Sequence, residues 1–272
     1  ITTGEYLTSG KAKISKNLAT IESIDQIQFM NDTYKKDVFR TSAITLYQLA
    51  ENVLLDFGWV VNEQGEYPFE IDESLKNIKT LGTLPMTKHS ECLQIIASAG
   101  GVTLFVDDRG YICLKPLPNE VADEDYIIDF NNSVTPPEPE EIEPLSQVDV
   151  SVHRYLRKAD TIELHKGEYV LEGRTTLQIE YRLSSNQSVT PPSGVTINSS
   201  VFYGHYCELD VTGTGTFEII VTGREIEDNI SIVTIPNQES GEIAPFDNPL
   251  ITDNVRAKAI GTIVKDYLKQ RI

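Results

Sequence analysis

Two segments in the first half of the chain carry the hydrophobic pattern of amphipathic helices. Apolar residues recur there at intervals of three and four, which places them on one face of a helix. Glycines that can adopt the left-handed conformation of a helix end follow both segments: Gly58 after the first, Gly100 and Gly101 after the second. We therefore predict helices over about 42–57 and 89–99.

A β-hairpin is predicted over 101–117, directly after the second helix. Two β-rich runs, VTLFV and YICLKPL, flank the four residues Asp107, Asp108, Arg109 and Gly110. Aspartate tolerates turn geometry, and glycine supplies the positive φ that a short hairpin needs. The aspartates could instead form a reactive carboxylate pair, but no histidine or third ligand stands beside them. We interpret them as turn residues.

Beyond the hairpin the pattern changes. Four prolines and four glutamates fill 133–145, which is typical of a stiff, charged linker. Over 146–240 apolar and polar residues alternate, and turn signals such as the Gly-Thr-Gly at 213–215 separate about six short runs. This region is expected to form an antiparallel β-sandwich. A last apolar stripe predicts a helical segment over 245–272.

These elements together predict an α+β fold. Residues 1–132 would form a platform module of two helices and the hairpin, and the segment 245–272 would pack on it. The sandwich 146–240 would be inserted between them, behind the linker 133–145.

The net charge argues against nucleic acids as partners. The chain of 272 residues has 41 acidic and 23 basic residues and a formal net charge of −18. Such a surface repels phosphate backbones, so we expect no nucleic-acid binding. No run of eighteen apolar residues occurs, and we therefore expect no membrane span.

Residue types that carry chemistry are few and scattered. Cys92, Cys113 and Cys207 form no C-x-x-C pair, which argues against a disulfide scaffold or a zinc site. No two of the histidines have a helical i, i+4 spacing; they are His89, His153, His165 and His205. The chain has no P-loop and no G-x-S-x-G motif. We expect no metal, no cofactor and no enzymatic activity.

Aromatic residues in the run VFYGHYCEL are the candidate contact residues for a ligand or partner. They are Phe202, Tyr203 and Tyr206, close to a predicted turn. Aromatic rings can stack on sugars, although packing within strands is their more common role.

Several phrases, taken in order, resemble a family of phage and prophage tail proteins, the baseplate or tail hub proteins. They are TSAITLYQLAENVLLDFG, YPFEIDESLKNI, TLPMTKHSECLQIIASAGGVTLFVDDRGYICLKPL and DNPLITDNVRAKAI. The resemblance covers 41–117 and 247–270.

The resemblance implies a structural role in a phage tail. Proteins of this family form rings of three subunits beneath the tail tube and connect it to spike or receptor-binding parts. The chain would then be the middle region of a longer tail-tip protein, a homotrimer in the full-length assembly, in contact with other baseplate proteins. It would be assembled in the bacterial cytoplasm and reside at the virion tail tip.

Three alternatives stay open. The β region could be a carbohydrate- or receptor-binding module that contacts a host surface glycan through Phe202, Tyr203 and Tyr206. The chain could be a fragment of a tail-associated cell-wall hydrolase, since acidic pairs can meet in space without any signal in the sequence. It could also be a bacterial surface or adhesion protein.

Overall fold

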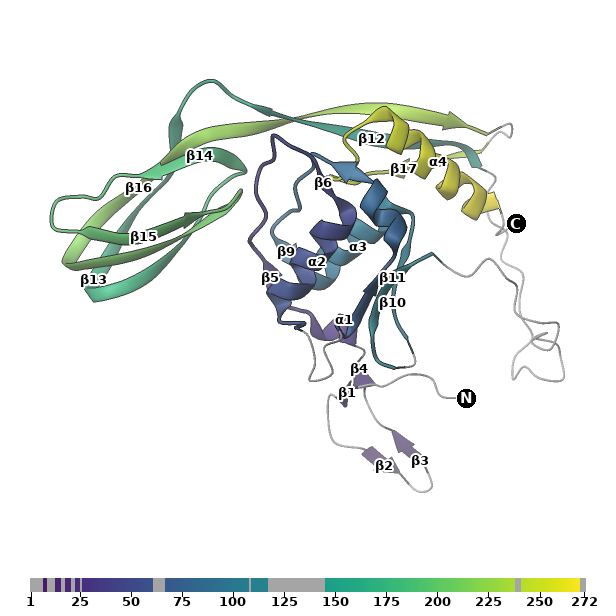
Figure 1. Cartoon of the computed structure of the whole chain (residues 1–272), viewed down its shortest axis with the longest axis horizontal. Helices are drawn as coiled ribbons and strands as arrows, with labels where there is room; N and C mark the ends of the chain where they lie inside the picture. The colour runs from purple at the N-terminus through teal and green to yellow at the C-terminus, as the bar shows by residue number, and fades with distance from the viewer. Residues whose placement is uncertain are drawn as a thin grey trace.

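A computed structural model gives the fold (Figure 1). It describes residues 7–8, 13–15, 18–20, 23–24, 26–60, 67–107, 109–116, 145–237 and 241–269. The fold is α+β and dominated by sheet, which confirms the predicted class. The predicted linker lies outside the described residues, except for its last residue.

The described elements are four α-helices, one 3-10 helix and seventeen strands. The helices are α1 (Gln26–Phe29), α2 (Leu46–Phe57), α3 (His89–Gly100), α4 (Asn254–Lys269) and the 3-10 helix η1 (Glu73–Asn77). The strands before residue 120 are β1 (Leu7–Thr8), β2 (Lys13–Ser15), β3 (Leu18–Thr20), β4 (Ser23–Ile24), β5 (Thr33–Tyr34), β6 (Ile44–Thr45), β7 (Phe69–Ile71), β8 (Lys79–Thr80), β9 (Thr87–Lys88), β10 (Thr103–Val106) and β11 (Ile112–Lys115). The later strands are β12 (Leu145–Arg157), β13 (Ile162–Glu180), β14 (Ser184–Val189), β15 (Thr196–Phe202), β16 (Tyr206–Pro236) and β17 (Glu242–Phe246).

Both predicted helices are present, and their ends follow from local chemistry. Helix α2 begins four residues after the predicted start, because Ile44 and Thr45 pair with β8 as strand β6. The Thr45 hydroxyl accepts a hydrogen bond from the Gln48 N–H at 3.1 Å, which caps the helix. Gly58 ends α2 at a φ of 102°, and Gly101 ends α3 at a φ of 63°.

The predicted hairpin is also present. Strands β10 and β11 pair antiparallel from Thr103↔Lys115 to Val106↔Ile112. Strand β7 adds to the other side of β11 in parallel, with Ile112 opposite Phe69. Helices α2 and α3 pack against this small sheet, and their buried leucines and isoleucines form one core with it. We call this unit the platform.

The region expected to be a sandwich is divided between two cores. Strand β12 pairs with the second half of β16, from Gln147↔Pro236 to Arg157↔Ile226, and β17 adds in parallel to β12. This connecting sheet lies over the platform (Figure 1). Val148, Val150 and Val152 are fully buried there and belong to the platform core.

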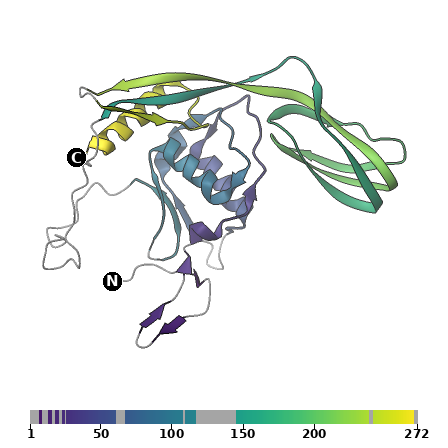
Figure 2. The same cartoon turned by 180° about the vertical axis from the view of Figure 1, so that it is seen from behind.

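The remaining strands form a separate lobe beside the platform (Figures 1 and 2). It consists of β13, β14, β15 and residues 206–225 of β16, and it has its own core. Strand β16 does not stop at 213–215, where we predicted a turn. Gly173 stands opposite Gly213 in an unbroken ladder, and Gly173 and Gly215 have φ values of 112° and 126°. These glycines let the paired strands curl without separating.

Helix α4 joins the connecting sheet to the platform. Its buried residues Ala257 and Ile260 belong to the platform core. Gly261 sits so close to the sheet that a Cβ there would lie 2.4 Å from Ile235 Cδ1 and 3.0 Å from Val150 Cγ2. The absence of a side chain therefore allows helix and sheet to approach. Among the described helices none is long and apolar enough to cross a membrane.

Candidate functional site

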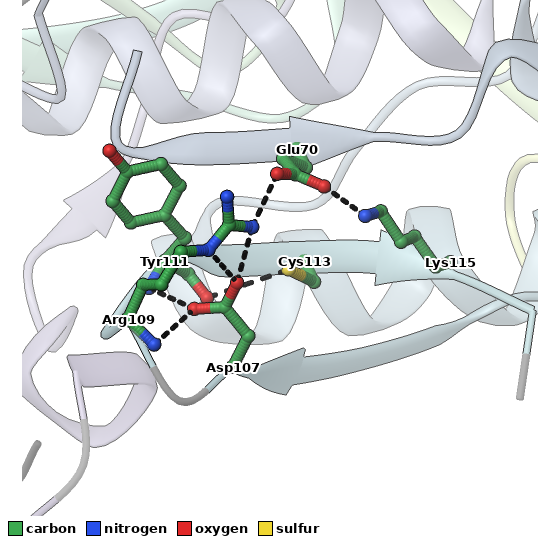
Figure 3. A network of polar contacts seen from close by, with 6 residues as sticks. All are labelled: Glu70, Asp107, Arg109, Tyr111, Cys113 and Lys115. Carbon is green, nitrogen blue, oxygen red and sulfur yellow. Dashed lines mark hydrogen bonds and ion pairs between the residues drawn. The ribbon is translucent and has the colours of Figure 1, made fainter. Parts of the chain in front are cut away.

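The hairpin turn is occupied by structural contacts (Figure 3). One oxygen of the Asp107 carboxylate accepts hydrogen bonds from the backbone N–H of Arg109 at 3.0 Å and of Tyr111 at 2.8 Å. Gly110 has the positive φ, 80°, that the sequence predicts. Asp108 lies outside the described residues.

The Arg109 side chain extends these contacts to the neighbouring strand. Its Nη2 lies 2.6 Å from Asp107 Oδ2 and 2.5 Å from Glu70 Oε1, and Lys115 contacts the other Glu70 oxygen. The hydrogen bonds from Lys115 and Arg109 lower the pKa of Glu70. Burial alone would raise the pKa of Asp107. The hydrogen bonds from Tyr111 and Arg109 outweigh this effect, so the pKa of Asp107 is lowered as well. Both carboxylates are thus held ionised by partners within the chain, which supports their interpretation as structural residues.

The three predicted contact residues lie at the turn between β15 and β16. Tyr203 and Tyr206 stack with their ring centroids 5.7 Å apart, and Phe202 packs against the lobe core. Only 2% of Tyr206 is exposed, and its hydroxyl donates to Glu208. Tyr206 therefore has a packing role, whereas Phe202 and Tyr203 are half-buried and keep accessible surface.

The turn also fastens the lobe to the platform. The Gly204 N–H donates to the Asp37 carbonyl at 2.7 Å. Lys35 Nζ lies 2.9 Å from Glu180 Oε1 and 5.3 Å from the centre of the Tyr206 ring. We call this set, Lys35 and Asp37 with Glu180, Gly204 and Tyr206, the lobe–platform contact.

Asp37 is held in place within the platform by buried polar contacts. Its side chain is nearly fully buried, forms an ion pair with Arg40 and accepts a hydrogen bond from the Leu84 N–H at 2.5 Å. Arg40 in turn donates to the Gly82 carbonyl at 2.7 Å. The lobe therefore docks on a segment whose own geometry is fixed by buried polar contacts.

A shallow groove on the lobe lies next to the turn, between β14 and β15. Apolar, hydroxyl and amide side chains line it: Gln187, Ser188, Val189, Pro191, Val195, Thr196, Ile197, Ser200 and Phe202. The Gln187 amide donates to the Tyr203 carbonyl at 2.9 Å. Among the predicted residues the structure thus brings Phe202 to a groove and places Tyr203 beside it.

Two buried histidines have partners that the sequence does not indicate. His89 Nδ1 lies 2.6 Å from the Asp32 carbonyl, and its Nε2 lies 3.0 Å from Asp56 Oδ2. His153 lies between two carboxylates, with Nδ1 2.7 Å from Asp228 and Nε2 3.1 Å from Asp247. Each histidine joins segments that are distant in sequence, and no spacing rule could reveal such pairs.

The described part of the chain contains no group of three or more histidine, cysteine or acidic side chains that could hold a metal ion. The three cysteines are free and buried. Burial raises the pKa of Cys92 to about 12 and that of Cys207 to about 11, which suppresses the reactive thiolate.

Comparison with known proteins finds no relative of this chain. No protein-family model matches it, and neither a curated protein nor a solved structure does. The resemblance to tail hub proteins therefore depends on the ordered sequence phrases alone.

Proposed function

We propose that the chain is a structural component of a phage or prophage tail tip, a part of the baseplate hub that links the tail tube to spike or receptor-binding proteins. The observation that carries this proposal is the continuity of β16, which belongs to the lobe core at one end and to the platform core at the other. A lobe joined in this way keeps a fixed orientation, which suits a part that connects two others.

The physical basis is the number of independent restraints. The β12–β16 ladder holds the strands together over the whole connection, and the lobe–platform contact adds a second attachment, between Gly204 and Asp37. A flexible linker would instead leave the lobe free to reorient. We infer protein–protein contacts as the chain's mode of action, with other tail-tip proteins as partners and a homotrimer in the full-length assembly.

The strongly acidic composition is compatible with a location near a channel that carries DNA. A net charge of −18 repels the phosphate backbone, so DNA would pass without binding. We propose no nucleic-acid binding and no catalytic role for this chain.

Immunoelectron microscopy tests the proposal directly. Antibodies raised against the chain would be applied to tailed particles purified from the encoding phage or induced strain, with an antibody to the major tail-tube protein as the control. The proposal predicts label at the distal tail end. Its absence from the particles, with the protein recovered elsewhere in the culture, would refute it.

A glycan-binding role is the second candidate, favoured by the groove between β14 and β15. Phe202 offers an aromatic surface there, and hydroxyls such as that of Ser200 stand close by. Binding to purified host cell-wall glycan should be lost in Phe202→Ala and weakened in Tyr203→Ala. Val201→Ala is the matched control, because Val201 is exposed on the same strand and does not line the groove. Equal binding by all four proteins, wild type included, would exclude this groove as the site.

A cell-wall hydrolase is the third candidate, and no feature of the described structure favours it. A turbidity assay on a cell-wall suspension tests it. Clearing that a single acidic substitution abolishes would overturn the non-catalytic proposal.

A further inference from the structure

The second half of β16 has a free edge. From Glu227 to Pro236 this strand pairs with β12 on one side, and none of the described strands pairs with its other side. The last neighbour there is Leu183, whose carbonyl accepts from the Ile226 N–H. Unpaired N–H and C=O groups along such an edge are a template for another strand.

The side chains of this edge favour pairing. The run from Asn229 to Ile235 is NISIVTI, without a charge or a proline, and is rich in β-branched residues. Ile230 and Ile232 are 57% and 65% exposed. They share the face of the sheet that points away from the platform core, since they stand opposite His153 and Ser151 and not opposite the buried valines. Lysine and proline, the usual protection of exposed edges, are absent from 229–235, and the one proline of this edge, Pro236, stands at its end.

The charge distribution along the edge favours one direction of pairing between two copies. Glu227 and Asp228 form an acidic end of the edge, and the uncharged Pro236 and Asn237 form the other. If two copies of this edge pair antiparallel about Ile232, each acidic end lies opposite an uncharged one. Parallel pairing in register would instead bring like charges opposite each other, which is destabilising. Antiparallel self-pairing about Ile232 therefore avoids contact between like charges.

We propose that β16 pairs antiparallel with β16 of a second copy of this chain, about a two-fold axis near Ile232. The two connecting sheets then form one continuous sheet, and the four exposed isoleucines, Ile230 and Ile232 from each copy, cover one another on its outer face. This dimer contact is independent of the tail-tip function proposed above and would be additional to any ring contact of a full-length protein.

The mass of the whole chain in solution tests the proposal, by light scattering coupled to size exclusion and by sedimentation over a concentration series. Wild type should form a dimer. Ile232→Lys places two lysines opposite each other at the axis and should raise the dissociation constant at least about tenfold. Ile243→Lys is the matched control, because Ile243 is 54% exposed on the same face at the opposite edge of the sheet. It should leave the dimer unchanged.

Circular dichroism would confirm that both variants fold, and hydrogen exchange supplies a second readout. In wild type, the amides within 228–235 that point away from β12 should lose protection on dilution, whereas those bonded to β12 should not. A chain that stays monomeric at every concentration would overturn the proposal, as would a trimer or any oligomer that Ile232→Lys leaves intact.

Discussion

Gly204 offers the sharpest test of how the lobe is held. A Cβ at this position would lie 3.2 Å from the Asp37 carbonyl oxygen and 3.0 Å from Leu183 Cδ1. The leucine methyl can move aside. The Asp37 carbonyl cannot, because the Asp37 side chain is held by Arg40 and by the Leu84 N–H. Gly204→Val should therefore push the lobe away from the platform.

The expected loss of stability in Gly204→Val is the sum of two contributions. Overpacking at a tight site costs about 1–3 kcal/mol. The hydrogen bond from Gly204 to Asp37 contributes about 1 kcal/mol if it is lost. The free energy of unfolding should thus fall by about 2–4 kcal/mol in Gly204→Val, and by less in Gly204→Ala.

Urea unfolding with two probes measures this effect. The single tryptophan, Trp59, reports on the platform, and far-UV circular dichroism reports mainly on the strands. Wild type should show one coincident transition, whereas the valine variant should lose the coincidence as lobe and platform separate. Val201→Ala, an exposed change three residues earlier, is the control. A Gly204→Val midpoint equal to that of wild type would show that the Asp37 carbonyl does not constrain this position.

Three further predictions follow from the packing and the ionised groups. Gly261→Ala should lower the free energy of unfolding by about 1–3 kcal/mol, seen in thermal unfolding, because its Cβ overlaps the Ile235 side chain; unchanged stability would contradict the close helix–sheet approach. Because the pKa of Glu70 is lowered on folding, its contribution to stability is present above the unfolded pKa of about 4.5 and is lost as pH falls through the lower, folded value. Wild type and Glu70→Gln should therefore differ at neutral pH and converge in acid, and a constant difference would oppose this. Cys92, with a pKa of about 12 and no exposed surface, should resist iodoacetamide at neutral pH until urea unfolds the chain, as mass spectrometry would show; rapid labelling of the native chain would contradict its burial.

The local elements could be predicted because their signals are local. The helical stripes, the left-handed glycines Gly58 and Gly101, and the Asp-Arg-Gly turn all act within a few residues, and the structure shows each of them. The start of α2 was the exception, since pairing of β6 with β8 depends on a segment more than thirty residues away.

The division of the β region could not be predicted in the same way. Alternation shows which face of β12 is apolar, but it does not show that helices α2, α3 and α4 share a core with that face. The glycines at 213–215 carry the signal of a turn, yet a paired strand can curl at such residues without ending. The burial of Tyr206 could not be predicted either. The sequence shows only an aromatic residue near a turn, and the packing of Lys35 and Glu208 around it shows that it is buried.

The distance distribution between lobe and platform in solution shows directly whether the lobe is held in one orientation. Spin labels would replace Val170 on the lobe and Val255 on α4, which are 70% and 80% exposed, while the buried native cysteines stay unlabelled. Labelled chains are diluted with unlabelled ones, so that only distances within one chain are measured. A lobe held by the β12–β16 ladder and by the lobe–platform contact then predicts one narrow distance distribution, which broadens in Gly204→Val. A broad distribution in wild type would show that the lobe reorients freely, and would contradict a chain built to hold two parts of an assembly in fixed register.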